Sequence, residues 1–213
     1  KVRRMGLEMG YDLVMEYIEG DDMGEKALLK SMSLEKKIDV LYQTVKALGF
    51  LHYRRFIHMD MKPSNIMVKP DGEVKLIDFG VTVNQGHVPY SVTGTAGYLS
   101  PEQIVREYVD ESTDMFALGI TFLVIFGGHP LRQSPEDLKS KHFRNEAKYH
   151  LDSVEQPAVT VFPDLGPVPE LAELLAQCTI PRRAKRMANT GALIPRLERI
   201  AKDRGIPLNG ADD

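Results

Sequence analysis

The longest regular pattern of apolar residues follows Ser33. Apolar side chains recur there at spacings of three and four, as they do along the buried face of an amphipathic helix. These positions are Ile38, Leu41, Val45, Leu48, and Leu51 or His52. Ser33 itself is a residue type that commonly caps a helix N-terminus. The pattern therefore predicts a long helix that begins after Ser33, preceded by a short helix within residues 24–32.

Two short apolar runs, residues 66–68 and 74–77, indicate a β-hairpin. The segment between them, Lys-Pro-Asp-Gly-Glu, carries residue types that favour a tight turn between two strands. Asn65 stands before the first run, and Asp78 directly follows the second. The predicted hairpin thus brings two potential metal ligands close together.

The rest of the pattern is mainly helical. The most apolar run, residues 115–128, is too short to span a bilayer and predicts a buried core helix. Ser134 followed by proline is typical of a helix start. The other predicted elements are a strand at 11–17 with a turn at 19–22, a polar loop at 81–100, an irregular Pro-rich segment at 156–169, and helices at 170–178 and 190–202, the second interrupted or bent near Pro195.

Composition and charge indicate a well-packed domain. The 213 residues are 43% hydrophobic, which is enough for one domain with a buried core. A formal net charge of -3 provides no broad basic surface, so nucleic-acid binding has no electrostatic support. Within the basic run 182–186 we expect a solvated turn with one structural arginine, and a phosphate or partner patch stays open as the alternative.

Cysteine usage bears on the compartment. Cys178 is the only cysteine, which excludes an internal disulfide and is consistent with a reducing compartment. Nothing at the start of the printed sequence resembles a signal peptide. We therefore expect a cytoplasmic protein with no membrane or nucleic-acid partner in this segment.

Two stretches carry the residues with the clearest chemistry: His-Met-Asp-Met-Lys-Pro-Ser-Asn at 58–65 and Leu-Ile-Asp-Phe-Gly at 76–80. They supply an acid, a lysine, an amide and a second acid, which are Asp60, Lys62, Asn65 and Asp78. In phosphoryl transfer a carboxylate orients the attacking hydroxyl and accepts its proton, a cation attends the γ-phosphate, and oxygen ligands hold magnesium. The two stretches match the needs of that reaction.

The first stretch resembles the protein-kinase catalytic loop H-R-D-L-K-P-x-x-N, with Met59 for the arginine and Met61 for the leucine. Because that arginine normally receives an activation-loop phosphate, a phosphate there would lack its main basic partner. Residues 78–80 resemble the metal-binding D-F-G turn of the same family. Residues 94–102 resemble the end of a kinase activation segment, with Ser100 where the usual A-P-E has alanine.

Three further matches follow the order of the family. Residues 11–20 resemble the strand and hinge that receive adenine, and residues 114–119 resemble the D-x-W-x-x-G start of the central helix, with Phe116 for the tryptophan. Arg186 falls where the family places a late arginine. On these motifs the chain is identified as a member of the eukaryotic-like Ser/Thr protein kinases. The resemblance implies an α+β, mainly α fold, the large C-terminal lobe, with the metal ligands on the small hairpin.

Two landmarks of a complete kinase domain do not occur in the printed sequence. It contains no G-x-G-x-x-G and no V-A-I-K-like lysine before the hinge. The resemblance implies a strand and hinge remnant of the small lobe at 1–20 and a helical lobe at 21–213, with a catalytic loop at 58–65 and an activation segment at 78–102. We expect the chain to be incomplete and inactive alone, with the small lobe supplied in cis upstream or by another chain.

The resemblance also implies a role for each matching residue. Asp60 would be the catalytic base, and Lys62 would contact the γ-phosphate of ATP. Asn65 and Asp78 would be ligands of Mg2+. Thr95 resembles the threonine whose hydroxyl bridges the catalytic aspartate and lysine, which favours Ser/Thr over Tyr specificity; a loop phosphosite is its simpler alternative.

An adenine pocket is implied in the same way. Its candidate residues are Met15, Glu16, Ile18, Asp22, Met67 and Ile77. The apolar side chains would line the pocket, with Met15 as the gatekeeper. The hinge backbone would hydrogen-bond the adenine edge, and the acid would reach the ribose. Ordinary core packing stays open as the alternative for the apolar members.

Two contacts are expected to be structural. A histidine beside a catalytic acid suggests a proton shuttle, but the resemblance implies that His58 stacks on Phe79 and is anchored toward Asp114. It also implies that Glu102 forms a buried ion pair with Arg186.

Two other function classes stay open. A chain without the phosphate-covering loop is compatible with a binding or scaffold module, and a measured nucleotide affinity would distinguish the two. Small-molecule phosphotransferases resemble H-G-D-x-x-x-x-N and lack the segment seen at 94–102, so this class ranks lower. The favoured reading is a Ser/Thr kinase that transfers the γ-phosphate of Mg-ATP to a hydroxyl of a protein substrate.

Overall fold

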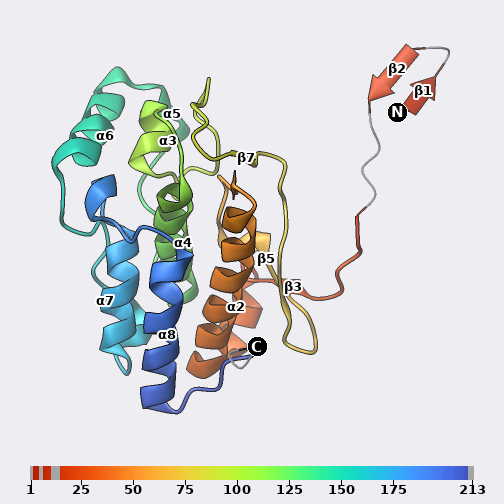
Figure 1. Cartoon of the computed structure of the whole chain (residues 1–213), viewed down its shortest axis with the longest axis vertical. Coiled ribbons are helices and arrows are strands. Elements are labelled where there is room, and N and C mark those ends of the chain that lie inside the picture. The colour runs from red at the N-terminus through yellow and green to blue at the C-terminus, as the bar shows by residue number, and fades with distance from the viewer. Residues whose placement is uncertain (1, 5–6, 11–14, 211–213) are drawn as a thin grey trace.

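The computed structural model describes residues 2–4, 7–10 and 15–210. Its helices are α1 (Lys26–Ser31), α2 (Leu34–Tyr53), α3 (Pro101–Val105), α4 (Glu111–Ile125), α5 (Pro135–Lys139), α6 (Lys141–Ser153), α7 (Pro169–Cys178) and α8 (Thr190–Arg204). Its strands are β1 (Val2–Arg4), β2 (Leu7–Gly10), β3 (Asp21–Asp22), β4 (Phe56–Ile57), β5 (Ile66–Val68), β6 (Val74–Leu76) and β7 (Val83–Asn84). Helices α2, α4, α7 and α8 run side by side, and α3, α5 and α6 gather at one end (Figure 1). The described part is thus mainly helical with a few short strands.

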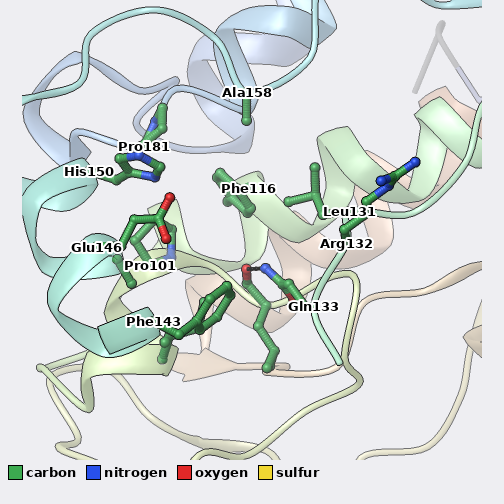
Figure 2. A pocket seen from close by; sticks show the side chains of 13 residues that line it. Pro101, Phe116, Leu131, Arg132, Gln133, Phe143, Glu146, His150, Ala158 and Pro181 are labelled. Atoms are coloured by element: carbon green, nitrogen blue, oxygen red, sulfur yellow. Dashed lines mark hydrogen bonds between the residues drawn. The ribbon is translucent and has the colours of Figure 1, made fainter. Parts of the chain in front are cut away.

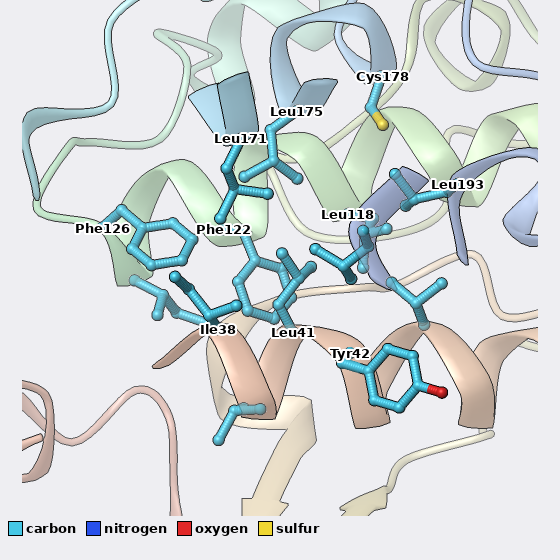
Figure 3. Close-up of a cluster of buried hydrophobic side chains, with 14 of the residues drawn as sticks. Ile38, Leu41, Tyr42, Leu118, Phe122, Phe126, Leu171, Leu175, Cys178 and Leu193 are labelled. Carbon is cyan, nitrogen blue, oxygen red and sulfur yellow. The ribbon is translucent and has the colours of Figure 1, made fainter. Parts of the chain in front are cut away.

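Helix α2 begins where the sequence predicted. The Ser33 side chain accepts a hydrogen bond from the backbone N–H of Lys36 at 3.2 Å, which satisfies one free N–H of the first turn. The predicted face is buried from Ile38 to Leu48, and it continues through His52 rather than through the half-buried Leu51. Figure 3 shows this face of α2 packed against apolar side chains of the neighbouring helices. The main core therefore lies between α2, α4, α7 and α8.

Helix α4 is the centre of the fold. It begins at Glu111, earlier than the apolar run at 115–128 indicated, because Asp110 caps it by accepting a hydrogen bond from the Ser112 N–H at 3.0 Å. Gly119 lets α7 approach closely, since a Cβ at this position would lie 2.7 Å from the Thr179 methyl carbon.

Within the described ranges, no helix is both long and apolar enough to cross a membrane.

The predicted hairpin is confirmed. Strands β5 and β6 pair antiparallel, with Ile66 opposite Leu76 and Val68 opposite Val74. The turn between them closes through a hydrogen bond from the Lys69 N–H to the Glu73 carbonyl at 2.9 Å. Strand β3 pairs with the other edge of β5, so a three-stranded sheet lies beside α2.

The structure departs from the sequence prediction at further elements. Residues 11–14 of the predicted strand lie outside the described residues, and residues 15–17 form no strand. Helices α3 and α6 were not anticipated. Helix α8 runs continuously through Pro195, so the predicted interruption is wrong, while the alternative of a bend stays a prediction; Leu193 and Leu197 on either side are buried in the core.

Candidate active site

Helix α4 fixes the backbone of His58 and Met59 by hydrogen bonds. Asp114, in the first turn of α4, accepts hydrogen bonds from the backbone N–H of His58 at 2.7 Å and of Met59 at 2.9 Å. The His52 ring nitrogen lies 2.8 Å from the same carboxylate. Two turns further along α4, the Thr121 hydroxyl donates to the Met61 carbonyl at 3.1 Å. The central helix thus fixes the backbone on both sides of Asp60.

His58 takes the structural place that was expected. Its ring lies 5.4 Å from the Phe79 ring, centroid to centroid, and its Nε2 is 3.2 Å from the Ile77 carbonyl oxygen. Its own backbone is anchored on Asp114. The predicted stack is therefore confirmed, and it links the 58–65 loop to the 78–80 turn.

Asp60, Lys62 and Thr95 meet in space. The Lys62 ammonium donates to Asp60 Oδ2 at 2.8 Å and to Thr95 Oγ1 at 3.0 Å. Asp60 is only 8% exposed, and among the residues that the structure describes its other oxygen, Oδ1, has no hydrogen-bond partner. The cluster therefore contains one carboxylate oxygen that is held by a cation and one buried oxygen that has no hydrogen-bond partner among the described residues.

The charge state of Asp60 follows from two opposing effects. Burial raises the pKa of its carboxyl, but the ammonium of Lys62 and the hydroxyl of Thr95 together lower the pKa by more, so the net shift is downward. Burial and the negative charge of Asp60 raise the pKa of Tyr98 nearby. Asp60 is accordingly an ionised carboxylate at neutral pH, the form that can accept a proton.

Asn65 and Asp78 lie at the open end of the hairpin. The Asn65 side-chain N–H donates to the backbone carbonyl of Asp60 at 2.8 Å. The backbone carbonyl of Asn65 accepts a hydrogen bond from the Ile77 N–H at 3.0 Å. Asp78 follows Ile77, is exposed, and has a φ of 63°. Because the amide nitrogen of Asn65 is engaged, its amide oxygen is the group left for a cation.

These residue types fit magnesium, which commonly takes one or two protein oxygens and completes its shell with phosphate and water. Within the described ranges, no group of three or more His, Cys, Asp or Glu side chains forms a self-contained metal site. The donor set of one amide and one exposed carboxylate therefore suits a cation that arrives with a phosphate ligand.

The residues expected around adenine are brought together only in part. Asp22 pairs with Met67 across the β3–β5 ladder, and the Asp22 carboxylate accepts the Gly24 N–H at 2.8 Å. Ile77 follows β6 in the same sheet. Met15, in contrast, is 74% exposed, Glu16 is also exposed, and Ile18 is half-buried. The sheet side of the expected pocket is assembled, whereas the side chains of Met15 and Glu16 are exposed to solvent.

Comparison with known proteins decides the family. A family model described as the protein kinase domain matches residues 8–194. The chain belongs to the protein kinase family.

Among its relatives are three bacterial kinases. The serine/threonine-protein kinase PknL of Mycobacterium tuberculosis H37Rv is 31% identical over 200 residues, covering 92% of this chain and 48% of PknL. PknB of Mycolicibacterium smegmatis is 31% identical over 171 residues, covering 74% of this chain and 27% of PknB. A probable serine/threonine-protein kinase of Streptomyces coelicolor is 33% identical over 161 residues, covering 70% of this chain and 23% of that protein. The chain spans less than half the length of these relatives.

The kinase fold also contains a pocket away from this site. A cavity of about 250 Å³ lies between α3, α4 and α6 and is lined mainly by apolar side chains, among them Pro101, Phe116 and Phe143 (Figure 2). None of the predicted site residues lines it. It lies under the end of the activation segment rather than at the Asp60 cluster.

Sequence reasoning missed two glutamines that hold the activation segment. Gln103 contacts the backbone of Met59 and Thr93, and Gln133 contacts the backbone of Gly97 and Leu99. A signal existed only for Gln103, which stands three residues after a serine at a helix start, the spacing of a capping box. Nothing in the local pattern distinguishes Gln133 from an ordinary surface glutamine.

Proposed function

We propose that the protein is a Ser/Thr protein kinase that transfers the γ-phosphate of Mg-ATP to a hydroxyl of a protein substrate. The cluster of Asp60, Lys62 and Thr95 is the observation that carries the proposal, because it pairs a buried carboxylate with one engaged and one free oxygen. Family membership and similarity to bacterial Ser/Thr kinases support the same reading.

In this proposal Asp60 orients the attacking hydroxyl and accepts its proton on Oδ1. Lys62 keeps Asp60 ionised and directs its ammonium toward the transferred phosphoryl group. The Thr95 hydroxyl, which accepts from Lys62, keeps that ammonium between the two segments. Positioning and charge stabilisation supply most of the catalysis in phosphoryl transfer, so this arrangement suits the reaction.

Asn65 and Asp78 are the proposed magnesium ligands, placed by the hairpin and the turn that follows it. Magnesium, when bound there, would neutralise the charge on the phosphate oxygens. The Asn65 amide oxygen adds a ligand without the repulsion of a further carboxylate. The hydrogen bond from Asn65 to the Asp60 carbonyl ties the proposed metal ligand to the loop that carries the proposed base.

The nucleotide would lie against the three-stranded sheet. Met67 and Ile77 are proposed to contact adenine, and Asp22 to reach the ribose. The same proposal requires the segment from Met15 to Ile18 to fold over the base, with Glu16 and Ile18 offering backbone hydrogen bonds. Its exposure here is consistent with a segment that gains its packing partners from the nucleotide and from a small lobe.

We further propose the division expected from the sequence, with residues 1–20 as a strand and hinge of the small lobe and residues 21–213 as the helical lobe. The printed sequence holds no glycine-rich phosphate loop, so the phosphates of ATP would be covered by a small lobe from the same polypeptide or from another chain. The cytoplasmic location stays a prediction.

The test uses the full-length gene product, γ-labelled ATP and a protein substrate such as casein. Labelled phosphoserine or phosphothreonine is expected with the natural protein, and Asp60→Asn should lower the rate by about 10²-fold or more. Asp71→Asn makes the same chemical change at an exposed position of the hairpin turn and should leave the rate unchanged. Nucleotide binding without transfer, or full activity of Asp60→Asn, would contradict the proposal, and the first result would favour a binding module.

A further inference from the structure

The side-chain amide of Gln103 is buried and fully hydrogen-bonded. Gln103 is 1% exposed in the first turn of α3. Its oxygen accepts from the Ser100 N–H at 3.0 Å and from the Ser100 hydroxyl at 3.1 Å. Its nitrogen donates to the Met59 carbonyl at 2.9 Å and to the Thr93 carbonyl at 2.9 Å. A primary amide has two N–H groups, and both are used here.

The two carbonyls belong to the two segments that form the candidate active site. Met59 directly precedes Asp60, and Thr93 lies just before Thr95. The Lys62 ammonium joins the same two segments through its contacts with the Asp60 and Thr95 side chains. Two sets of hydrogen bonds therefore fix the distance between the two segments. Lys62 connects their side chains, and Gln103 connects their backbones.

The backbone of Gly94 is packed closely against Met59 and Gln103. Gly94 has a φ of +116°, and a Cβ added to it would lie 2.7 Å from the Met59 carbonyl oxygen and 3.1 Å from the Gln103 nitrogen. The activation segment thus passes directly against the carbonyl that Gln103 holds. A shift of Gln103 would therefore displace the backbone of both segments.

The surroundings of Met59 explain why an uncharged group makes the connection. Met59 is buried in an apolar cluster with Ile57 and Val109, and Val81 and Val83 pack against it. A lysine or arginine would be desolvated at this place, whereas an amide satisfies two carbonyls without burying a charge. The catalytic loop and the activation segment are joined here by neutral hydrogen bonds.

We propose that Gln103 is a positioning residue of the phosphoryl-transfer site, which aligns Asp60 with Thr95 by joining the Met59 and Thr93 carbonyls. The proposal rests on the proposed function for its kinetic consequence, and its structural consequence can be measured without any activity. Gln103 touches neither substrate nor reacting atoms, so it acts through the two segments it connects.

The chain offers a matched control. The Gln43 nitrogen donates to the Gly72 carbonyl at 3.0 Å and to the Asp39 carboxylate at 3.1 Å, and its oxygen accepts the Val74 N–H at 3.0 Å. Gln43→Leu therefore removes a similar set of hydrogen bonds from α2 and the hairpin turn, without a contact to the Met59 or Thr93 backbone. Comparison with Gln103→Leu separates loss of alignment from general loss of stability.

The experiment measures hydrogen exchange and steady-state kinetics on the full-length protein. In Gln103→Leu we expect faster exchange in residues 59–65 and 92–98 and a kcat lowered about 10- to 100-fold, with the KM for ATP changed by less than about 3-fold. In Gln43→Leu we expect faster exchange in the hairpin turn and α2, with residues 59–65 and 92–98 exchanging as in the wild-type protein. Wild-type exchange and wild-type kcat in Gln103→Leu would overturn the proposal.

A second variant covers the case in which Gln103→Leu does not fold. Gln103→Met keeps the length of the side chain without burying a charge, and it loses the donors to Met59 and Thr93, so it removes the connection. The same exchange and kcat changes are expected, and their absence would again overturn the proposal. If the natural protein transfers no phosphate, the proposed function fails, while the exchange comparison still decides the role of Gln103.

Discussion

The Arg186 guanidinium and the Glu102 carboxylate form a buried two-point ion pair. Arg186 Nη1 lies 2.6 Å from Glu102 Oε1, and Nη2 lies 3.1 Å from Oε2, with both side chains 0% exposed. The remaining guanidinium N–H groups donate to the carbonyls of Ser112, Ile180 and Pro181. The pair ties the end of the activation segment to the turn before α8, as the resemblance implied.

Removal of either partner should destabilise the protein strongly, because the other charge is then left buried. Breaking a buried pair typically costs about 3–5 kcal/mol, a large part of the ~5–15 kcal/mol of a domain. Glu102→Ala and Arg186→Ala should each lower the melting temperature sharply in thermal unfolding, and the double variant should lose less than the sum of the two.

The neighbouring Arg182 provides the control for this prediction. Its ion pair with Glu155 lies at the surface, so Arg182→Ala should change stability by no more than about 1 kcal/mol. Purely additive effects of Glu102→Ala and Arg186→Ala, each no larger than that of Arg182→Ala, would show that the buried pair does not behave as a coupled unit.

The same pair makes stability depend on acid pH. Burial raises the pKa of Glu102, but the charge and hydrogen bonds of Arg186 outweigh burial and place the pKa below its ordinary value of 4.5. A folded-state pKa that is depressed stabilises the protein above the unfolded pKa, and this contribution is lost as pH falls through the folded value. Urea unfolding between neutral and acid pH should therefore show a steeper loss of stability below about pH 4.5 in the natural protein than in Glu102→Gln. Parallel curves for the two proteins would contradict the prediction.

What the sequence predicted well is local or belongs to a motif. The hairpin follows from one turn and two apolar runs, and α2 follows from a cap and a helical period. The Asp60 loop was found because its residues stand close together in one motif. The contact of Lys62 with Thr95 was expected only because the resemblance joins these two segments.

What it missed depends on contacts between distant segments or on weak patterns. Helix α6 buries only Ala147 and Leu151 among many charged residues, so its apolar period is faint. The predicted strand fails at residues 15–17, since a strand needs a pairing partner and no strand of the described ranges pairs with it. Gln103 was missed because its partners Met59 and Thr93 come together only in the folded protein.

Activation-loop phosphorylation should not be required for activity. The place of the usual phosphate-receiving arginine is taken by Met59, which lies in an apolar cluster rather than beside a phosphate. Alanine at both Ser91 and Thr93 should leave kcat within about 2-fold, because no charge-assisted contact to the loop is lost. A large fall in kcat with the fold intact, measured by circular dichroism, would count against this.

A polypeptide limited to residues 1–213 should show negligible kinase activity. The printed sequence contains no glycine-rich loop and no strand lysine before the hinge, and these groups cover and position the phosphates. The measurement compares this polypeptide with the full-length gene product in the same labelled-ATP assay. Robust phosphorylation of casein by residues 1–213 alone would show that phosphate cover is dispensable here.

Substitution of Asp60 and of Asp78 should have different effects on the affinity for Mg-ATP. Asp60 is engaged by Lys62 within the protein, whereas Asp78 is exposed at the end of the hairpin and is the proposed magnesium ligand. In the full-length protein, Asp60→Asn should abolish turnover and leave the Kd for Mg-ATP within about 3-fold. Asp78→Asn should abolish turnover and also weaken Mg-ATP binding by about 10-fold or more, since it removes an oxygen that is proposed to hold the cation.

Calorimetric titration with ATP in the presence and absence of magnesium measures this contrast directly. The magnesium dependence of binding should be lost in Asp78→Asn and kept in Asp60→Asn, because only the first change removes an oxygen proposed to contact the cation. Asp71→Asn, on the exposed turn of the same hairpin, should bind like the natural protein and controls for loss of one surface charge. Equal affinity of the Asp60 and Asp78 variants for Mg-ATP would remove Asp78 from the metal site, whereas weak binding by Asp60→Asn alone would place the cation at the Asp60 cluster instead.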